Sequence, residues 1–111
     1  MRTFETGATR DTDEDKPDYE GILSPLVIVR YGEYMQTHRV QADGGLRASD
    51  NWQKGIPKSA YMASGFRHFI DWWSAHRGCP SRDGIEDAIC GLLFNAFGYL
   101  HELLKEEHEC H

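Results

Sequence analysis

The chain has 111 residues and a formal net charge of −6 at pH 7. This length supports one domain with a single modest core, and the acidic balance excludes the basic stripe that binds nucleic-acid backbones. No run approaches the roughly 18 apolar residues that span a bilayer, and the N-terminus is polar where a signal peptide would be apolar. We therefore expect a cytoplasmic protein with neither a nucleic-acid nor a membrane partner.

Both ends of the chain are polar. Residues 1–20 are rich in Thr, Asp and Glu and almost free of periodic apolar residues, which predicts an extended or disordered arm before a domain over residues 21–111. Three histidines and a cysteine bunch at the C-terminus without distant ligands to close a tetrahedral zinc site, so we expect a frayed helix end there. The three cysteines form no CxxC pair and predict no disulfide framework.

A first helix is predicted over residues 25–38, because Ser24 suits the N-cap and Pro25 the first helical position. A connection of about twenty residues follows, and long ordered connections in small domains are often functional. Its chemical candidates are Asn51, Trp52 and Lys54, since an amide and an indole can contact a base and an ammonium can meet a phosphate. The alternative that Trp52 only anchors the connection in the core stays open.

A second helix is predicted over residues 59–77, with Ser59 as N-cap and Gly78 closing its end. At 3.6 residues per turn it has an apolar side and a polar side of selected residue types. Two readings stay open for the polar side: it caps the core, or it forms one wall of a site. The apolar side holds Met62, Phe66, Phe69, Ile70 and Trp73, and the polar side holds Ser64, Arg67, His68 and Asp71.

A third helix is predicted to continue to about residue 107, with Ser81 as N-cap and Asp83 in its first turn, where the helix dipole favours a negative charge. It is apolar on nearly all sides, and three helices cannot bury it alone. We therefore expect a small all-α bundle of about three main helices, completed by a homo-oligomer, a dimer or tetramer, with the third helix in the interface.

Polar residues interrupt this apolar helix at helical spacing. Asp83, Asp87 and Asn95 share one ridge, Glu86 lies on a separate line, and an amide flanked by Phe residues needs partners when it is buried. Structural readings stay open: Asp83 as a dipole partner, Glu86 paired with Arg82, and Asn95 bonded to a neighbouring helix. Together with the polar side of the second helix, these groups would suit Mg²⁺ or Mn²⁺, which prefer oxygen ligands.

Five segments that together cover nearly the whole chain have a familiar pattern: GATRD, KPDYEGILSP, DNWQKGIP, YMASGFRHFIDWW and LLFNAFGYLHELL. With them the chain resembles the dATP/dGTP diphosphohydrolase N-terminal family of phage proteins, which looks related to the MazG-like all-α nucleoside triphosphate pyrophosphohydrolases. The resemblance implies hydrolysis of dGTP or dATP between the α- and β-phosphates, giving dGMP or dAMP and pyrophosphate. Such an enzyme shapes a phage nucleotide pool, including the pool for 2-aminoadenine DNA.

The resemblance also implies a Mg²⁺ (or Mn²⁺) cofactor, held in MazG-like enzymes by ExxE on one helix and ExxD on the next. This chain departs from that pattern, with His68-x-x-Asp71 and Asp83-x-x-Glu86. We carry the roles over as expectations, with Glu33 as an outside metal candidate. The expected catalytic and metal-binding residues are His68, Asp71, Glu86 and Asp87; Lys54 and Arg67 would contact phosphates, and Asn51, Trp52 and Asn95 would hold sugar or base.

Two other functions stay open. An HD-type triphosphohydrolase would also use His and Asp, but the adjacent His-Asp pair is absent because Phe69 follows His68. A non-catalytic helical module that dimerises through the third helix would need none of this chemistry.

Overall fold

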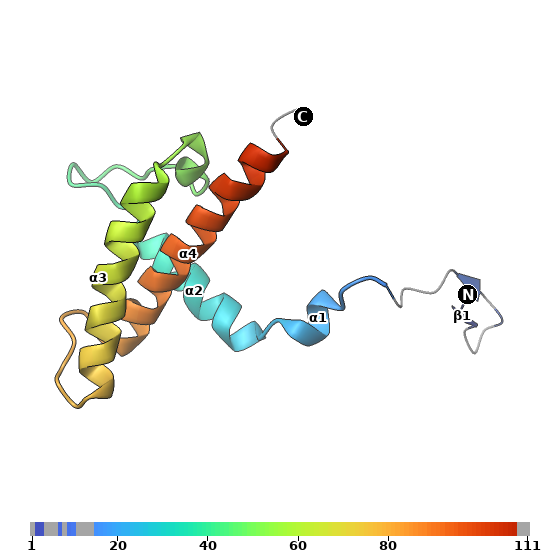
Figure 1. The fold of residues 1–111 in the computed structure, drawn as a ribbon, viewed down its shortest axis with the longest axis horizontal. Helices are drawn as coiled ribbons and strands as arrows, with labels where there is room; N and C mark the ends of the chain where they lie inside the picture. Colours follow the sequence, from blue (N-terminus) through green and yellow to red (C-terminus); the bar gives the residue numbers. More distant parts are fainter. Residues whose placement is uncertain (1, 4–6, 8, 11–14, 109–111) are drawn as a thin grey trace. The chain divides into compact units, whose positions relative to one another are not determined.

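The computed structural model of the chain is predominantly helical, which confirms the predicted all-α fold. The structure describes residues 2–3, 7, 9–10 and 15–108, and the chain forms two compact units, Met1–Arg30 and Tyr31–His111. The C-terminal unit is built on two long helices, α3 (Lys58–His76) and α4 (Ile85–Glu107), which run antiparallel in Figure 1.

The N-terminal unit contains short elements that the sequence pattern did not predict. Strands β1 (Arg2–Thr3) and β2 (Thr9–Arg10) pair antiparallel. Helix α1 (Tyr19–Ile22) is capped by Asp18, whose side chain accepts from the Gly21 N–H at 3.2 Å. Much of the predicted arm, like the final Cys and His of the C-terminal cluster, lies outside the described residues.

Helix α2 (Pro25–Thr37) begins as predicted. The Ser24 hydroxyl oxygen accepts a hydrogen bond from the Val27 N–H at 3.3 Å, which satisfies one of the N–H groups that a helix start leaves without a partner. Proline at the first position loses nothing there because it has no N–H to leave unpaired.

Helix α3 starts one residue before the predicted position and ends as expected. Pro57 occupies the N-cap position, so the prediction of Ser59 as the cap is wrong, and Ser59 lies inside the helix. At the other end Gly78 has φ +91°, the Cys79 N–H donates to the Ser74 carbonyl at 2.9 Å, and the Gly78 N–H donates to the Ala75 carbonyl at 3.0 Å. These paired bonds form a Schellman motif.

Helix α4 begins later than the sequence predicts. Gly84, with φ +95°, occupies its N-cap position, so Asp83 precedes the helix, and Glu86 and Asp87 occupy its first turn. The prediction of Ser81 as the cap is therefore wrong. Its hydroxyl oxygen is buried without a hydrogen-bond partner in the part of the chain that the structure describes.

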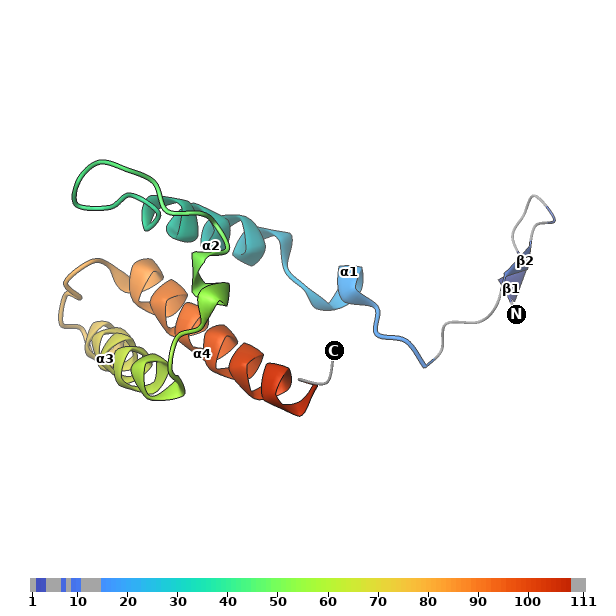
Figure 2. The ribbon, with the colours of Figure 1, turned by 90° about the horizontal axis from the view of Figure 1, so that it is seen from above.

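Three glycines let α3 and α4 lie close together (Figure 2). A side-chain carbon at Gly91 would lie 2.5 Å from the His68 ring, one at Gly65 would lie 3.1 Å from Asn95 Cβ, and one at Gly98 would overlap the Tyr61 ring. The glycines alternate between the helices, so each provides a notch for a larger side chain across the interface. This packing fixes the register of α3 against α4 and places His68 and Asn95 in the middle of it.

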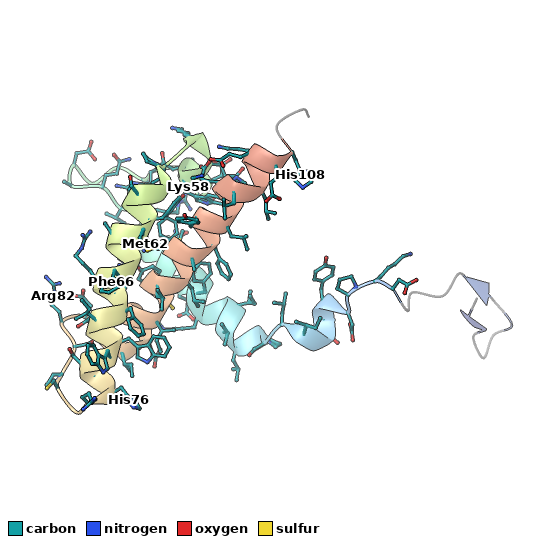
Figure 3. All side chains as sticks on the ribbon, in the orientation of Figure 1. Lys58, Met62, Phe66, His76, Arg82 and His108 are labelled. Carbon is teal, nitrogen blue, oxygen red and sulfur yellow. The ribbon has the colours of Figure 1, made fainter. Side chains whose placement is uncertain are left out.

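The face of α3 that meets α4 combines Tyr61 and Gly65 with part of the polar side. Tyr61 and Gly65 are buried and His68 is half-buried, whereas Met62 and Phe66 on the apolar side are 57% and 60% exposed (Figure 3). The helix is amphipathic as predicted, but in a single chain its apolar side is uncovered. Small residues on the polar side permit the close approach that bulky apolar residues would prevent.

An apolar groove of about 440 Å³ follows this uncovered side. It lies between α3 and α4 and is lined by Tyr61, Met62, Gly65, Phe66, Phe69, Leu92, Asn95, Ala96, Tyr99, Leu100 and Leu103. None of these residues is charged. No helix in the described part of the chain is long and apolar enough to cross a membrane.

The connection between α2 and α3 contains a short hairpin and a 3-10 helix. Val40 and Leu46 form an isolated antiparallel bridge, and the Arg47 N–H donates to the Arg39 carbonyl at 2.9 Å. Gly44 has φ +86° at the tip of this turn. The helix η1 (Asn51–Lys54) follows and leads to the start of α3.

Candidate functional site

A cavity of about 530 Å³ lies between the end of α2, the connection that follows it, α3 and α4. We call it the basic pocket. It is lined by Tyr34, Met35, Thr37, His38, Arg39, Val40, Arg47, Ala48, Ser49, Asn51, Trp52, Ile56, Ser64, His68, Phe94 and Asn95.

The charge of this lining is opposite to that of the chain. Two guanidinium groups, Arg39 and Arg47, give it positive charge, the imidazoles of His38 and His68 also line it, and none of its described lining residues carries a carboxylate. The whole chain has a net charge of −6. A pocket with this lining attracts anions, because the two guanidiniums in its wall raise the local potential.

The short hairpin brings the two arginines together. Arg39 Nε donates to the Arg47 carbonyl at 2.9 Å, and Arg39 Nη1 donates to Gln36 Oε1 at 3.0 Å. A guanidinium has five N–H donors, so others remain for a ligand. The bonds to Arg47 and Gln36 hold the planar group in one orientation, which lowers the entropy that a ligand contact would cost.

His68 reaches the basic pocket from α3, with its ring packed on Gly91 of α4. The pKa of His68 is lowered, first by burial of the ring and then by the nearby Arg67 charge, while Asp71 and Asp83 oppose the shift. The neutral imidazole is therefore favoured, and it has a nitrogen that can accept a proton.

Asn95 is 5% exposed and lies where α3 and α4 are closest. Its Nδ2 donates to the Gly91 carbonyl of the preceding turn at 2.7 Å. The sequence predicted that this amide needs a partner, and the structure provides one within its own helix. Asn95 also lines the basic pocket.

Asn51 and Trp52 enter the basic pocket from η1. The Trp52 ring meets the His101 ring of α4 edge to face, with centroids 4.7 Å apart. Trp52 thus anchors the connection on α4 and also lines the pocket, so the two sequence readings of this residue are compatible.

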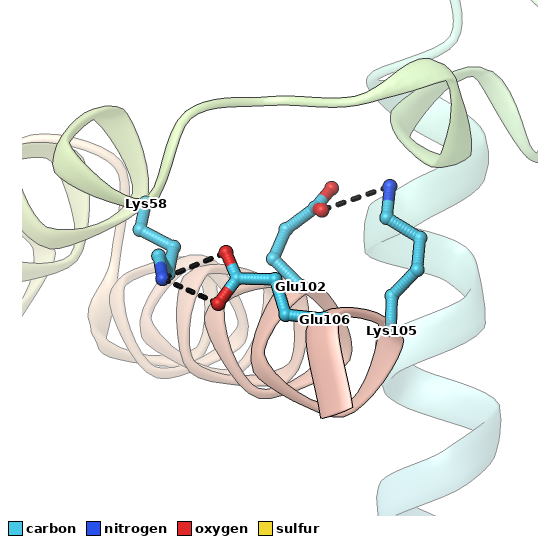
Figure 4. A network of polar contacts seen from close by, with 4 residues as sticks. All are labelled: Lys58, Glu102, Lys105 and Glu106. Atoms are coloured by element: carbon cyan, nitrogen blue, oxygen red, sulfur yellow. Dashed lines mark hydrogen bonds and ion pairs between the residues drawn. The ribbon is translucent and has the colours of Figure 1, made fainter. Parts of the chain in front are cut away.

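Glu102 of α4 is a second anchor of the connection. Its carboxylate is 8% exposed and lies 2.9 Å from Lys105 Nζ. The hydrogen bond from Lys105 lowers the pKa of Glu102, burial opposes this shift, and the nearby main chain of Ile56 also lowers it. Figure 4 shows Glu102 directed toward the segment between η1 and α3, beside the exposed Lys58–Glu106 ion pair.

Lys54, Arg67 and Glu33 do not line the basic pocket. All three are exposed, Arg67 on the outer face of α3 and Glu33 on α2. Their predicted contacts with phosphate or metal stay predictions.

The acidic residues lie outside the pocket lining but act on it electrostatically. Asp71 Oδ1 accepts from the Arg82 N–H at 3.2 Å. The pKa of Tyr34 is raised by burial and then by the charges of Asp87 and Asp83. His68 and Tyr34 therefore mark the end of the basic pocket that the carboxylates influence.

The expected metal ligands do not come together as a group. Within residues 2–3, 7, 9–10 and 15–108, no three His, Cys, Asp or Glu side chains lie close enough to hold one metal ion. Glu86 and Asp87 occupy the first turn of α4, where the helix dipole favours negative charge. The side chains as arranged do not fit a metal centre on their own.

Sequence reasoning missed Tyr34, His38, Arg39 and Arg47 as pocket residues. The signal was present for the arginines, because Asp43-Gly44 between two short β-prone stretches is a typical hairpin turn. Such a turn would have indicated that Arg39 and Arg47 lie near each other on the two strands of a hairpin.

Comparisons with protein-family models, with curated proteins and with solved structures find no match to this chain. The composition of the basic pocket is therefore the main structural support for a function.

Proposed function

We propose that the chain binds a deoxynucleoside triphosphate in the basic pocket and hydrolyses it to the monophosphate and pyrophosphate. One observation carries the proposal: a cavity lined by two guanidiniums, two imidazoles, an indole and two amides, and by no carboxylate, in a chain of net charge −6. The positive groups suit a polyphosphate, and the indole and amides suit a base and sugar. The resemblance to dATP/dGTP diphosphohydrolases supports the choice of reaction.

Arg39 and Arg47 are the proposed phosphate-binding residues. Arginine binds phosphate oxygens through two parallel N–H bonds, which fixes direction as well as adding charge. Arg39 is already oriented by Gln36 and by the Arg47 carbonyl.

His68 is the proposed proton acceptor. A water oxygen forms a bond to the α-phosphorus while the bond from that phosphorus to the bridging oxygen breaks, and the electron pair leaves with pyrophosphate. The water proton passes to the neutral His68 imidazole. The charges of Asp71 and Asp83, which act on His68, stabilise the imidazolium that forms.

The resemblance also implies Mg²⁺ or Mn²⁺, with His68, Asp71, Glu86 and Asp87 as ligands. These residues do not form a ligand group in the described part of the chain, so no step is assigned to a metal ion here. Dependence on a divalent cation is an outcome of the assay below.

A second copy of the chain is the proposed occupant of the apolar groove. Phe66, Phe69 and Leu100 are 60%, 44% and 51% exposed, and burying each would contribute about 1.5–3 kcal/mol. The groove is formed by both antiparallel helices, so two copies related by a two-fold axis would present the same uncharged surface to each other. The proposed substrate belongs to the cytoplasmic nucleotide pool, where we propose the oligomer acts.

Product analysis tests the reaction. Each of the four deoxynucleoside triphosphates is incubated with the protein and Mg²⁺, Mn²⁺ or a chelator, and the products are separated by anion exchange. The proposal predicts a monophosphate and pyrophosphate. Arg47→Ala should raise KM at least about tenfold, because a hydrogen bond to a charged group contributes about 1.5–3 kcal/mol.

Arg77→Ala is the matched control, since it removes the same charge at the exposed end of α3; its KM should equal that of the wild type. Inorganic triphosphate with nucleoside as products would instead indicate an HD-type triphosphohydrolase. Absence of turnover under every condition would indicate the non-catalytic dimerisation module, which the uncovered apolar groove favours as the second candidate.

A further inference from the structure

A second cavity of about 270 Å³ lies beside the basic pocket, and we infer that it binds the nucleobase of the ligand. We call it the aromatic recess. Its side-chain lining consists of Tyr31, Met35, Ser49, Trp52, Phe94 and Phe97. The inference rests on the proposed function in one respect: the proposed function identifies the phosphates that bind next to the recess.

The recess and the basic pocket share part of their walls. Met35, Ser49, Trp52 and Phe94 line both cavities. A ligand placed against Trp52 can therefore extend into each of them. The two arginines line the basic pocket alone, so the two ends of such a ligand meet different chemistry.

The recess accepts a flat uncharged group. Four of its six lining side chains are aromatic, and aromatic faces stack on nucleobases with a contribution of about 1–3 kcal/mol per base. Three of the rings are held in place by other rings: Tyr31 and Phe97 meet edge to face with centroids 5.5 Å apart, and Trp52 rests against His101. Rings fixed in this way lose little freedom when a base stacks on them.

The polar groups of the recess are two hydroxyls, on Ser49 and Tyr31. Burial raises the pKa of Tyr31 to about 12, so its hydroxyl stays protonated and can donate a hydrogen bond at every physiological pH. None of the described side chains that line the recess is charged, and a phosphate would lose its hydration there without compensation. The base therefore occupies the recess, and the phosphates occupy the basic pocket.

Two probes separate the two ends of the site. Calorimetric titrations measure the Kd of a nucleoside, either deoxyadenosine or deoxyguanosine, and the Kd of inorganic triphosphate. Phe97→Leu removes a ring that lines the recess and not the basic pocket, at a position that is 52% exposed. It should weaken nucleoside binding at least about fivefold and leave triphosphate binding unchanged.

Two further variants complete the design. Arg47→Ala should show the reverse pattern, with weaker triphosphate binding and unchanged nucleoside binding. Phe66→Leu is the matched control, because it makes the same change at a similarly exposed position of the apolar groove; both Kd values should stay at the wild-type level. Thermal midpoints of all variants report whether each remains folded.

Several results would overturn the inference. It fails if neither nucleoside binds the wild type up to its solubility limit, or if Phe97→Leu leaves nucleoside binding unchanged while the protein is folded. Triphosphate binding that depends on Arg47 would in that case leave the proposed function standing. Nucleoside binding that depends on Phe97, in a protein that hydrolyses no triphosphate, would instead support the recess and contradict the proposed reaction.

Discussion

At the scale of single residues, glycines decide how closely α3 and α4 pack. Gly98 faces the ring of Tyr61, which is 2% exposed. A buried ring held by its neighbours cannot move aside cheaply for a new methyl group. The sequence shows Gly98 within a helical pattern, but it does not show which side chain lies opposite.

Gly98→Ala should therefore destabilise the fold. We expect a net loss of about 1–2 kcal/mol, because overpacking outweighs the gain in helix propensity. Urea unfolding followed by circular dichroism measures the change. The matched control is Gly32→Ala on the exposed side of α2, where, apart from its own stretch of helix, no described residue lies within 4 Å of the added carbon; it should stabilise the protein by up to about 1 kcal/mol. Equal effects at the two positions would contradict the packing described.

His68 makes the stability of the fold depend on pH. Its pKa is lowered from 6.5 by burial and by Arg67, with His38 acting in the same direction and Asp71 and Asp83 opposing. The unfolded chain then binds more protons than the folded one between the two pKa values, so stability rises with pH in that range. The contribution is complete above about pH 6.5 and is lost as the pH falls through the folded pKa.

His68→Gln should flatten this pH dependence. Urea unfolding from pH 7.5 to 5 measures it, and His76→Gln, at an exposed position of the last turn of α3, is the control that should retain the wild-type slope. A His68→Gln slope equal to that of the wild type would show that His68 does not carry the effect.

Residue types predicted part of the site. Asn51, Trp52, His68 and Asn95 line the basic pocket as expected candidates for ligand contact. Arg39 was overlooked because its role depends on a hairpin that pairs it with a distant residue. Lys54 is a candidate from its neighbours in sequence, but it is exposed and does not line the pocket, which sequence spacing cannot reveal.

At the scale of elements, the spacing of apolar residues predicts that a helix forms, whereas the residues at which it begins and ends depend on backbone conformation. Helix α2 starts at its predicted cap, because Ser24 favours the N-cap position and Pro25 favours the first helical position. The start of α4 was misplaced because Gly84 adopts a left-handed conformation that separates Ser81 from the helix. A cap residue in the sequence cannot act when the backbone between it and the helix turns away.

Glu102 should control the order of the connection before α3. Glu102→Ala removes the acceptor near the Ile56 N–H, so amide hydrogens over residues 49–56 should exchange faster. Glu102→Gln keeps an acceptor and should restore much of the protection. Glu106→Ala is the control, because the exposed pair with Lys58 contributes little. Exchange rates that rise equally in the Glu102→Ala and Glu106→Ala variants would contradict a specific role for Glu102.

At the scale of the whole molecule, the uncovered apolar groove predicts self-association. Periodicity gave the apolar sides of both long helices, but it could not show that α3 turns part of its polar side to α4. The small residues at the interface explain that choice, since Gly65 and Gly98 permit contacts that Phe66 would block. The apolar sides then stay uncovered in one copy, and we propose that a second copy packs on them.

Phe66→Asp should shift this association toward the monomer. Placing a charge in the groove should raise the dissociation constant of the dimer at least about tenfold, since each copy loses about 1.5–3 kcal/mol of burial. Sedimentation equilibrium measures it. Leu46→Asp is the control, because Leu46 is 57% exposed on the hairpin and lies outside the apolar groove. A wild type that stays monomeric at every concentration would contradict the assembly.

We propose that the two cavities beside Trp52 together form a nucleotide site. Titration of the ¹⁵N-labelled protein with a non-hydrolysable deoxynucleoside triphosphate, followed by ¹H–¹⁵N correlation spectra, tests it most directly. Two tryptophan indoles serve as internal reporters. The Trp52 signal should shift together with the amides of Arg39, Arg47 and Asn95, while the signal of Trp73, which is 51% exposed on the apolar side of α3, should not. If the Trp52 signal does not shift at saturating triphosphate, or if shifts are confined to residues of the apolar groove, there is no nucleotide site beside Trp52.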